Sequence, residues 1–241
     1  MRGILLVARR DFAAYVNTYW GWVIITVALL LDGVLFQAVG VTNTPQYSAD
    51  VLKQFFYTHG GVSLAVGVVT TMRLFAEERQ TGTMVLLESS PLSDRQLVMG
   101  KYLSAMMLMA LFQALTLYMP GMILVNGKIG YDQIAVGYFG VMLMSSAGIA
   151  VGTWTSSISR NQILAAVLGA IVVMFFVMCF RIAKVTDPPF NSLFTQVAFY
   201  MKQFAPFEEG RINTENVVYF GSVTFGFLLL ATQALTSRRW E

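Results

Sequence analysis

Few side chains in this sequence could carry out covalent chemistry. His59 is the one histidine and Cys179 the one cysteine among the 241 residues. A Ser-His-Asp triad needs a histidine beside a serine and a carboxylate, and a histidine-rich metal site needs several histidines. His59 falls near one end of an apolar segment, where we expect a polar residue at the membrane interface. The sequence therefore predicts no catalytic residue, no metal site and no cofactor site in this chain.

The nearest approach to a nucleotide-binding loop also fails. Residues 121–129 read Gly-Met-Ile-Leu-Val-Asn-Gly-Lys-Ile. A phosphate loop has four residues between its glycines and a Ser or Thr after the lysine to hold magnesium. Here five residues separate Gly121 from Gly127, and Ile129 follows Lys128. We interpret the segment as a turn, so the chain itself should not hydrolyse ATP.

Asp32 is an acidic residue inside an apolar run, Leu-Leu-Leu-Asp-Gly-Val over residues 29–34. An ionised carboxylate at the centre of a membrane costs about 2.5 to 3.5 kcal/mol on insertion scales. Asp32 can face a pathway, bind a cation, or pair with a helix dipole or an arginine of another subunit. It can equally be a protonated or hydrogen-bonded packing residue.

The densest charge lies in a short insert between two apolar segments. Residues 77–91 read Glu-Glu-Arg-Gln-Thr-Gly-Thr-Met-Val-Leu-Leu-Glu-Ser-Ser-Pro. These charges cannot lie in hydrocarbon, whereas Met84, Leu86 and Leu87 need something other than water to cover them. We therefore expect a partner surface to cover the insert at the membrane face.

Start and stop signals organise this insert. Thr81 and Thr83 can cap a short helix that extends to Leu87, Gly82 permits a tight bend, and Pro91 ends the helix. The order of these signals favours a structured element over an ordinary charged loop.

Two further signals follow the insert. Ser93 and Gln96 have the spacing of a capping box, which predicts a helix that continues through Lys101 into an apolar segment. Pro120-Gly121 should kink that segment or end its regular part, because proline cannot donate the helical hydrogen bond.

Composition indicates an integral membrane protein. Hydrophobic residues make up 56% of the chain and charged residues 12%, and the mean hydropathy is +0.62, far from the values of soluble domains. About 20 helical residues cross the hydrocarbon core, and six runs are long enough. They are Trp20 to Val41, Phe56 to Phe75, Tyr102 to Val125, Ile134 to Ser156, Ile163 to Phe180 and Val217 to Leu235. The expected fold is a single all-α, polytopic domain over residues 1–241.

With six spans, both chain ends share one side of the membrane. If that side is the cytoplasm, ten of the 16 Lys and Arg residues lie inside, as the positive-inside rule favours. We therefore expect a bacterial cytoplasmic (inner) membrane protein with both termini in the cytoplasm. Arginines alternate with apolar residues over 1–18, which predicts an interfacial helix. Nothing in the net charge of +3 suggests nucleic acid.

Residues 181–216 form the one long outer loop. Pro188 and Pro189 break the chain, and Asn191 or Ser192 can then cap a helix through Lys202 with apolar residues at helical spacing. We expect this amphipathic helix to lie on the outer leaflet, where membrane lipids or a partner protein would contact it.

The fourth span contains a small-residue motif. Gly148 and Gly152 form a G-x-x-x-G pattern that lets another helix approach closely. Packing within this chain is the favoured interpretation, and a dimer face or pathway is the second.

Two segments of the chain together carry a resemblance to a known family. The first segment contains Phe75-Ala76-Glu77-Glu78-Arg79-Gln80-Thr81-Gly82-Thr83, Leu86-Leu87, Pro91-Leu92-Ser93 and Val98-Met99-Gly100-Lys101. The second is Phe207-Glu208-Glu209-Gly210-Arg211-Ile212-Asn213, leading into Val217-Val218-Tyr219-Phe220. With these segments the chain resembles the permeases of type-2 ATP-binding-cassette (ABC-2) exporters. Similarity is greatest to gliding-motility and nitrous-oxide-reductase-accessory permeases, and it covers nearly the whole length.

This resemblance implies a non-catalytic membrane half-transporter. Its loop at residues 77–92 would hold the coupling helix, seated in a groove of a cytoplasmic ABC ATPase subunit that binds the ATP and magnesium. The implied partners are that ATPase, a second permease half, identical or sibling, and an accessory protein outside the membrane. Implied ATPase contacts are Glu77, Glu78, Thr81, Gly82, Met84, Leu87 and Glu88.

Two other classes fit the sequence less well. An ion-gradient-driven secondary transporter predicts ionisable residues in several spans and internal inverted repeats, whereas the chain has one acidic residue of this kind and no repeat. An intramembrane enzyme needs a nucleophile, base or metal cluster at membrane depth. None can be assembled from these residues.

Overall fold

A computed structural model describes residues 2–40, 47–84, 92–127, 129–187 and 190–238. Over these ranges the chain has helices and no β-strand, and six helices are long and apolar enough to cross a membrane. The prediction of an all-α fold with six spans is confirmed. The spans are Tyr19–Ala38, Ser48–Gln80, Asp94–Val125, Tyr131–Ile158, Gln162–Val185 and Thr214–Ser237.

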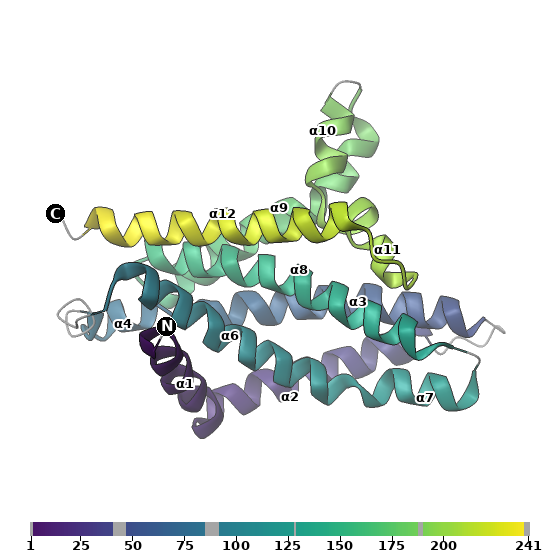
Figure 1. The fold of residues 1–241 in the computed structure, drawn as a ribbon, viewed down its shortest axis with the longest axis horizontal. Coiled ribbons are helices and arrows are strands. Elements are labelled where there is room, and N and C mark those ends of the chain that lie inside the picture. Colours follow the sequence, from purple (N-terminus) through teal and green to yellow (C-terminus); the bar gives the residue numbers. More distant parts are fainter. Residues whose placement is uncertain (1, 41–46, 85–91, 128, 188–189, 239–241) are drawn as a thin grey trace.

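Most of the spans lie side by side along one long axis (Figure 1). Helix α8 (Tyr131–Ile158) lies at the centre and packs against four other spans. These four are α3 (Ser48–Thr71), α6 (Asp94–Thr116), α9 (Gln162–Val185) and α12 (Thr214–Arg238). The first span, α2 (Tyr19–Leu35), continues as the π-helix η1 (Phe36–Gly40) and packs against α3.

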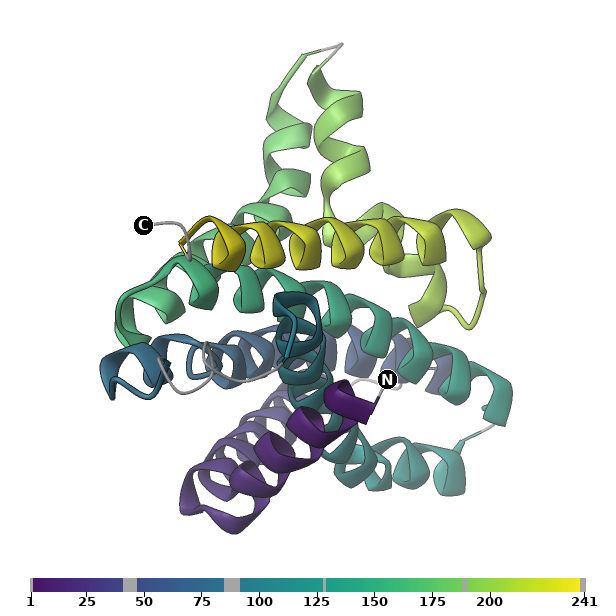
Figure 2. The same cartoon turned by 60° about the vertical axis from the view of Figure 1, so that its left-hand side comes forward.

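The two ends of the bundle differ. Both chain ends and the short helix α4 (Ala76–Gln80) lie at one end, which we call the α4 end, and α7 (Tyr118–Asn126) lies at the other, the α7 end (Figure 1). An even number of spans requires this arrangement of the chain ends. Helix α1 (Arg2–Asn17) crosses the spans at the α4 end and packs on α6 (Figure 2). It is the helix predicted for residues 1–18.

Small residues allow close contacts between helices within the chain. A Cβ atom at Gly148 of α8 would lie 2.7 Å from Leu64 Cδ2, and one at Gly152 would collide with the hydroxyl of Thr71. The G-x-x-x-G face therefore lies against α3 of the same chain, which is the arrangement favoured from the sequence. Gly100 has the same role between α6 and α1, because a Cβ there would lie 2.7 Å from Val7 Cβ.

The third span is interrupted close to its proline. α6 ends at Thr116, Leu117 forms a turn, and α7 begins at Tyr118. Pro120 has no N–H group to donate to the carbonyl of Thr116, four residues earlier, so the helical hydrogen-bond ladder has a gap at this turn.

The segment after α9 differs from the single helix predicted for residues 191–202. It forms α10 (Phe190–Val197), a π-helix η2 (Phe199–Gln203) and α11 (Ala205–Glu208), with a break at Ala198. Phe199 and Phe204 are fully buried, so burying these rings diverts the backbone from one continuous helix. α10 and the end of α9 project from the bundle (Figures 1 and 2).

Candidate functional site

Helix α4 is tied to the end of α8. The backbone N–H groups of Phe75 and Ala76 donate to Ser156 Oγ over 3.0 and 3.2 Å. One turn later, Arg79 Nη1 donates to the carbonyl oxygen of Ser159 over 2.9 Å. The first two bonds satisfy backbone N–H groups that have no helical partner at a helix start. All three fix α4 to the end of α8.

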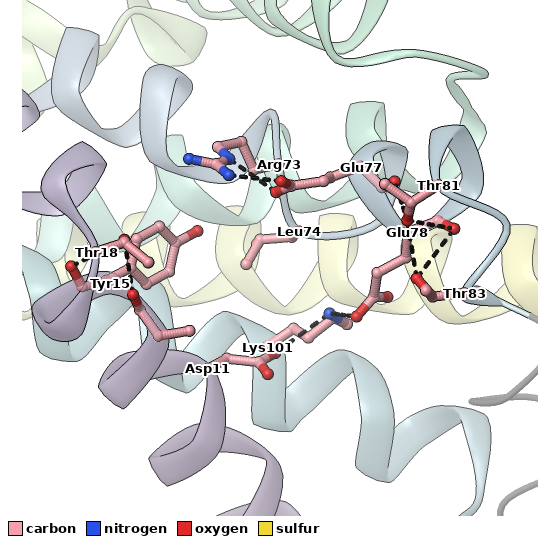
Figure 3. Close-up of a pocket in the computed structure, with 11 residues that line it drawn as sticks. Asp11, Tyr15, Thr18, Arg73, Leu74, Glu77, Glu78, Thr81, Thr83 and Lys101 are labelled. Carbon is pink, nitrogen blue, oxygen red and sulfur yellow. Dashed lines mark hydrogen bonds and ion pairs between the residues drawn. The ribbon is translucent and has the colours of Figure 1, made fainter.

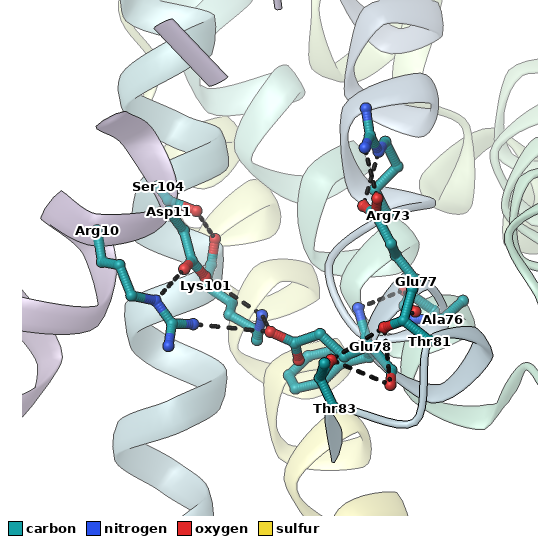
Figure 4. Close-up of polar contacts among 12 residues, drawn as sticks. Arg10, Asp11, Arg73, Ala76, Glu77, Glu78, Thr81, Thr83, Lys101 and Ser104 are labelled. Atoms are coloured by element: carbon teal, nitrogen blue, oxygen red, sulfur yellow. Dashed lines mark hydrogen bonds and ion pairs between the residues drawn. The ribbon is translucent and has the colours of Figure 1, made fainter. Parts of the chain in front are cut away.

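A network of charges around the buried Lys101 joins α4 to α1 and α6 (Figure 4). Lys101 Nζ lies 2.7 Å from Glu78 Oε1 and 3.2 Å from Asp11 Oδ2, and the Lys101 side chain is 3% exposed. Arg10 Nε lies 2.8 Å from the other oxygen of Asp11, and Arg10 Nη2 lies 3.6 Å from Glu78. A lysine that is covered this completely is held there by its two carboxylates.

A second group of contacts ties the same region to α2 and α3. Arg73 Nε donates to Glu77 Oε2 over 2.7 Å, and the Arg73 guanidinium lies 5.6 Å from the ring centroid of Trp20. The hydroxyl of Tyr15 in α1 donates to the carbonyl oxygen of Thr70 over 2.8 Å. Burial raises the pKa of Tyr15, so the phenol stays protonated and remains a donor.

These ion pairs line a pocket of about 370 Å³ between α1, α4 and α6 (Figure 3). Each charged side chain in the lining is in an ion pair within the chain. Among the described lining residues the pocket therefore offers no unpaired charge to a ligand, and these residues instead link the elements. The charged lining residues are Asp11, Arg73, Glu77, Glu78 and Lys101.

The turn after α4 is the exposed tip of the insert. Gln80, Thr81, Gly82 and Thr83 are all exposed. Gly82 has a φ angle of 72°, in the left-handed region that suits glycine, and its N–H donates to the Arg79 carbonyl over 3.2 Å.

Of the two threonines expected to cap the short helix of the insert, Thr81 has a different place. Thr81 is the C-cap residue of α4, and its hydroxyl donates to the Glu77 carbonyl over 2.9 Å. It does not begin a new helix, because α4 already starts at Ala76, five residues earlier. Thr83 directly precedes Met84, which is helical. The predicted helix end at Leu87 and the stop at Pro91 lie outside the described residues.

The structure describes five of the seven residues that were expected to contact the ATPase, and they differ in exposure. Thr81 and Gly82 are exposed, whereas Glu77 and Glu78 use their carboxylates in ion pairs within the chain. Met84 is 8% exposed and packs in an apolar cluster with Val7, Leu74 and Phe75. Its side chain is thus covered by this chain rather than presented to a partner. Leu87 and Glu88 lie outside the described residues.

The capping box after the insert is confirmed. Gln96 N–H donates to Ser93 Oγ over 3.4 Å, and Ser93 N–H donates to Gln96 Oε1 over 3.3 Å. The box starts α6 and thereby places Lys101, two turns further on, opposite α1 and α4.

A separate polar pair lies inside the spans. Asp32 Oδ2 lies 2.5 Å from His59 Nδ1, and neither side chain is exposed. The sequence predicted a polar interfacial residue at His59, whereas the structure buries its side chain completely against Asp32, about 16 Å along α3 from Ser48. Sequence reasoning missed this pair, although one acid and one histidine in consecutive spans are a detectable signal. Among the described residues, no group of three His, Cys, Asp or Glu could hold a metal.

Six spans, an N-terminal helix across one end and a charged insert at that end define a polytopic helical membrane protein. The family model described as "ABC-2 family transporter protein" matches residues 14–235. The chain therefore belongs to the ABC-2 transporter family, and it is a membrane component of an ABC transporter. This membership implies an ABC ATPase partner and favours a permease over a gradient-driven transporter. A search of curated proteins found no match.

Proposed function

We propose that this chain is the permease subunit that couples ATP hydrolysis by a cytoplasmic ABC ATPase to export or to force transmission across the membrane. The exposed turn around Gly82 is the contact for the ATPase. The observation that supports this role is the buried Glu78–Lys101–Asp11 network, which connects α4 to α1 and α6.

The connections around α4 can transmit a displacement. Moving α4 alone would separate the largely covered Glu78 carboxylate from Lys101, the cation closest to it, which is costly. It would also break the bonds from Phe75 and Ala76 to Ser156. A push on the turn therefore moves α1, α6 and the end of α8 together with α4.

This function assigns sides to the two ends of the bundle. The α4 end and both termini face the cytoplasm, and the α7 end faces outward from the inner membrane. A second permease half, identical or sibling, completes the transporter. Exposed apolar side chains on α2 and α9, such as Leu31 and Ile171, offer surface for lipids and for that second half.

The test begins with the tagged full chain purified from its native membranes. We expect an ABC ATPase to co-purify, and we expect its hydrolysis rate to depend on the turn. Gly82→Pro removes the N–H bond to Arg79 and cannot adopt the φ angle of 72°. This variant should lose the ATPase or its stimulation while the spans stay folded.

Gly210→Pro is a stringent control, because Gly210 also has a positive φ angle, 77°, and donates its N–H to a carbonyl three residues earlier, that of Phe207. A Cβ atom at Gly210 would in addition lie 2.9 Å from Gln133 Cγ, whereas one at Gly82 meets no atom within 4 Å, so the control is the more disruptive of the two changes. Gly210 follows α11, at the other end of the bundle from α4 in this proposal, so Gly210→Pro should keep the ATPase. A Gly82→Pro chain that binds and stimulates the ATPase normally would contradict the proposed contact.

A further inference from the structure

Polar side chains from three spans have buried atoms without a partner. Ser63 of α3, Gln113 of α6 and Ser145 of α8 have exposed fractions of 0%, 7% and 0%. In the part of the chain that the structure describes, Ser63 Oγ, Gln113 Nε2 and Ser145 Oγ have no hydrogen-bond partner. An unpaired polar atom in the interior of a membrane protein is costly, so these atoms point to a ligand that pairs with them.

The helices that carry these residues pack against one another, and an aromatic layer marks one level of their contact (Figure 1). The ring of His59 in α3 lies 5.5 Å from that of Phe112 in α6 and 5.7 Å from that of Tyr138 in α8. Thr116 of α6 lies at the same level, because its hydroxyl is 3.1 Å from the Tyr138 hydroxyl. Since α3 runs from the α7 end to the α4 end, this level lies between Ser63 and the α7 end.

The same three helices meet again on the α4 side. A Cβ atom at Gly67 of α3 would lie 3.3 Å from Ile149 Cγ1 of α8 and 3.9 Å from Met109 Cε of α6. Ser63 lies four residues after His59 and four before Gly67, and residues four apart share one face of a helix. Ser63 therefore lies between the two levels and faces α6 and α8.

Gln113 and Ser145 lie between the same two levels. Gln113 is four residues after Met109 and three before Thr116, and Ser145 is four residues before Ile149. Each thus shares the helix face of residues that contact the other two helices. The three side chains form one polar layer between α3, α6 and α8.

Other buried hydroxyl groups of the spans bond to carbonyl oxygens of their own helix. Thr70, Thr71 and Thr153 each donate to the carbonyl four residues earlier, over 2.7 Å. Ser63 and Ser145 do not make this bond among the described residues. Their hydroxyl groups are therefore free to pair with a ligand in the polar layer.

We propose that the polar layer binds a water molecule that links α3, α6 and α8 inside the membrane. Buried waters in proteins typically make about three hydrogen bonds to polar groups that otherwise have no partner. One water that accepts from Gln113 Nε2 and donates to the oxygens of Ser63 and Ser145 pairs all three atoms.

The surroundings favour water over other ligands. Gln113 presents an N–H donor to the layer, whereas a metal cation requires atoms that donate lone pairs. Packing is also tight beside the layer, because a Cβ atom at Gly60 of α3 would lie 2.6 Å from Met144 Cε of α8. Such close contact of the helices favours a ligand as small as water.

Solid-state NMR can detect this water directly. The full chain, labelled with ¹⁵N at its glutamine side chains, is placed in lipid nanodiscs, and the Gln113 signal is identified by its loss in Gln113→Met. We expect magnetisation transfer from water to the Gln113 amide, and loss of this transfer in Ser63→Ala/Ser145→Ala. Gln203 is the matched control, because it is 6% exposed and its Nε2 donates to the Gln196 carbonyl over 3.0 Å. Its signal should be the same in both chains.

Two outcomes of this measurement would overturn the proposal. The first is the absence of transfer from water to Gln113 in the wild type. The second is equal transfer in the wild type and the serine double variant, because the water would then not depend on the two hydroxyl groups.

Thermal unfolding gives a second test, because a shared water couples residues on different helices. Ser63→Ala and Gln113→Met should each lower the unfolding temperature, and the double variant should lose less than the sum of the two losses. Ser104→Ala is the control, since Ser104 is buried but donates to the Lys101 carbonyl within α6. Its effect should add to that of Gln113→Met. A higher unfolding temperature in Ser63→Ala would show that this hydroxyl has no partner, and additive losses would show that Ser63 and Gln113 share none. Either result argues against the bridging water.

Discussion

Glu208 is a buried carboxylate at the end of α11, within the sequence segment that resembles other permeases. Burial raises the pKa of Glu208 from an ordinary 4.5 to about 7, while Lys53 opposes this shift and Glu209 adds to it. The neighbouring Glu209 behaves in the opposite way, because its hydrogen bonds to Lys53 and Arg211 lower its pKa. Two adjacent acids thus differ in charge near neutral pH because one is covered and the other is paired.

The raised pKa predicts a pH dependence of stability. Between pH 4.5 and 7 the folded chain binds a proton at Glu208 that the unfolded chain has released, so the free energy of unfolding falls as pH rises through this window. The shift corresponds to a loss on the order of 3 kcal/mol by pH 8. Glu208→Gln removes this loss, and its unfolding temperature in nanodiscs should fall less than that of the wild type from pH 5 to pH 8.

Glu215→Gln is the control for this residue, because Glu215 is an exposed acid in the first turn of α12. It should keep the pH dependence of the wild type. If Glu208→Gln also kept that dependence unchanged, the buried carboxylate would not be the titrating group.

His59 shows what the sequence could and could not reveal about single residues. The apolar run from Phe56 suggested that His59 lies three residues inside a span, whereas the helix begins at Ser48. Lys53 lies in these first turns with its ammonium 2.7 Å from Glu209 Oε1, so a contact far away in sequence helps to extend the helix. Hydropathy alone could not show this contact, so the apolar run did not reveal the first turns of α3 or the complete burial of His59.

At the scale of elements, the buried Lys101 controls how α1, α4 and α6 fit together. Lys101→Met would remove the buried cation that Glu78 and Asp11 share and leave them with Arg10, which is more than half exposed. We expect a loss of about 3 kcal/mol in the free energy of unfolding, measured by thermal or denaturant unfolding in detergent. Adding Glu78→Gln should recover part of this loss, since one of the two carboxylates is then neutral. No recovery in the double variant would argue against the pairing.

Close packing of α1 on α6 gives a second prediction for the elements. Gly100→Ala places a Cβ 2.7 Å from Val7 Cβ and 3.0 Å from the Ile4 carbonyl oxygen. Such overpacking typically costs about 1 to 3 kcal/mol, so the variant should unfold earlier and expose α1 to protease. Gly226→Ala on α12 meets no atom within 4 Å and should be neutral or slightly stabilising. Equal behaviour of the two variants would contradict a tight α1–α6 contact.

Local sequence signals predicted some elements accurately and others poorly. The Ser93–Gln96 box and the break near Pro120 depend on neighbouring residues, and both appear in the structure. The helix expected through Lys202 is instead broken at Ala198, because Phe199 and Phe204 bury their rings in the core. Tertiary packing of this kind cannot be read from helical periodicity. The charge network around Lys101 was not predictable from local signals either, because Lys101 and Asp11 are 90 positions apart in the sequence.

On the scale of the whole molecule, the six apolar runs were sufficient to predict the architecture. Each run corresponds to one span, and the family match over residues 14–235 agrees with the resemblance carried by the insert. The relative placement of the spans was not predictable from hydropathy. It depends on contacts such as Gly148 against Leu64 and on the polar pairs that link neighbouring helices.

The central claim is that the turn after α4 meets an ABC ATPase at the cytoplasmic face. The most direct measurement is cysteine crosslinking in native membranes, with Thr83→Cys in a chain that carries Cys179→Ala, since Thr83 is exposed and Cys179 is the one native cysteine. Glu215→Cys, in the first turn of α12, is the matched position, which the proposed orientation places on the opposite side of the membrane. We predict a crosslink to an ABC ATPase from position 83 alone, and labelling by a membrane-impermeant thiol reagent in intact cells at position 215 alone. Labelling of position 83 from outside the cell, or a crosslink to the ATPase from position 215 alone, would contradict the account.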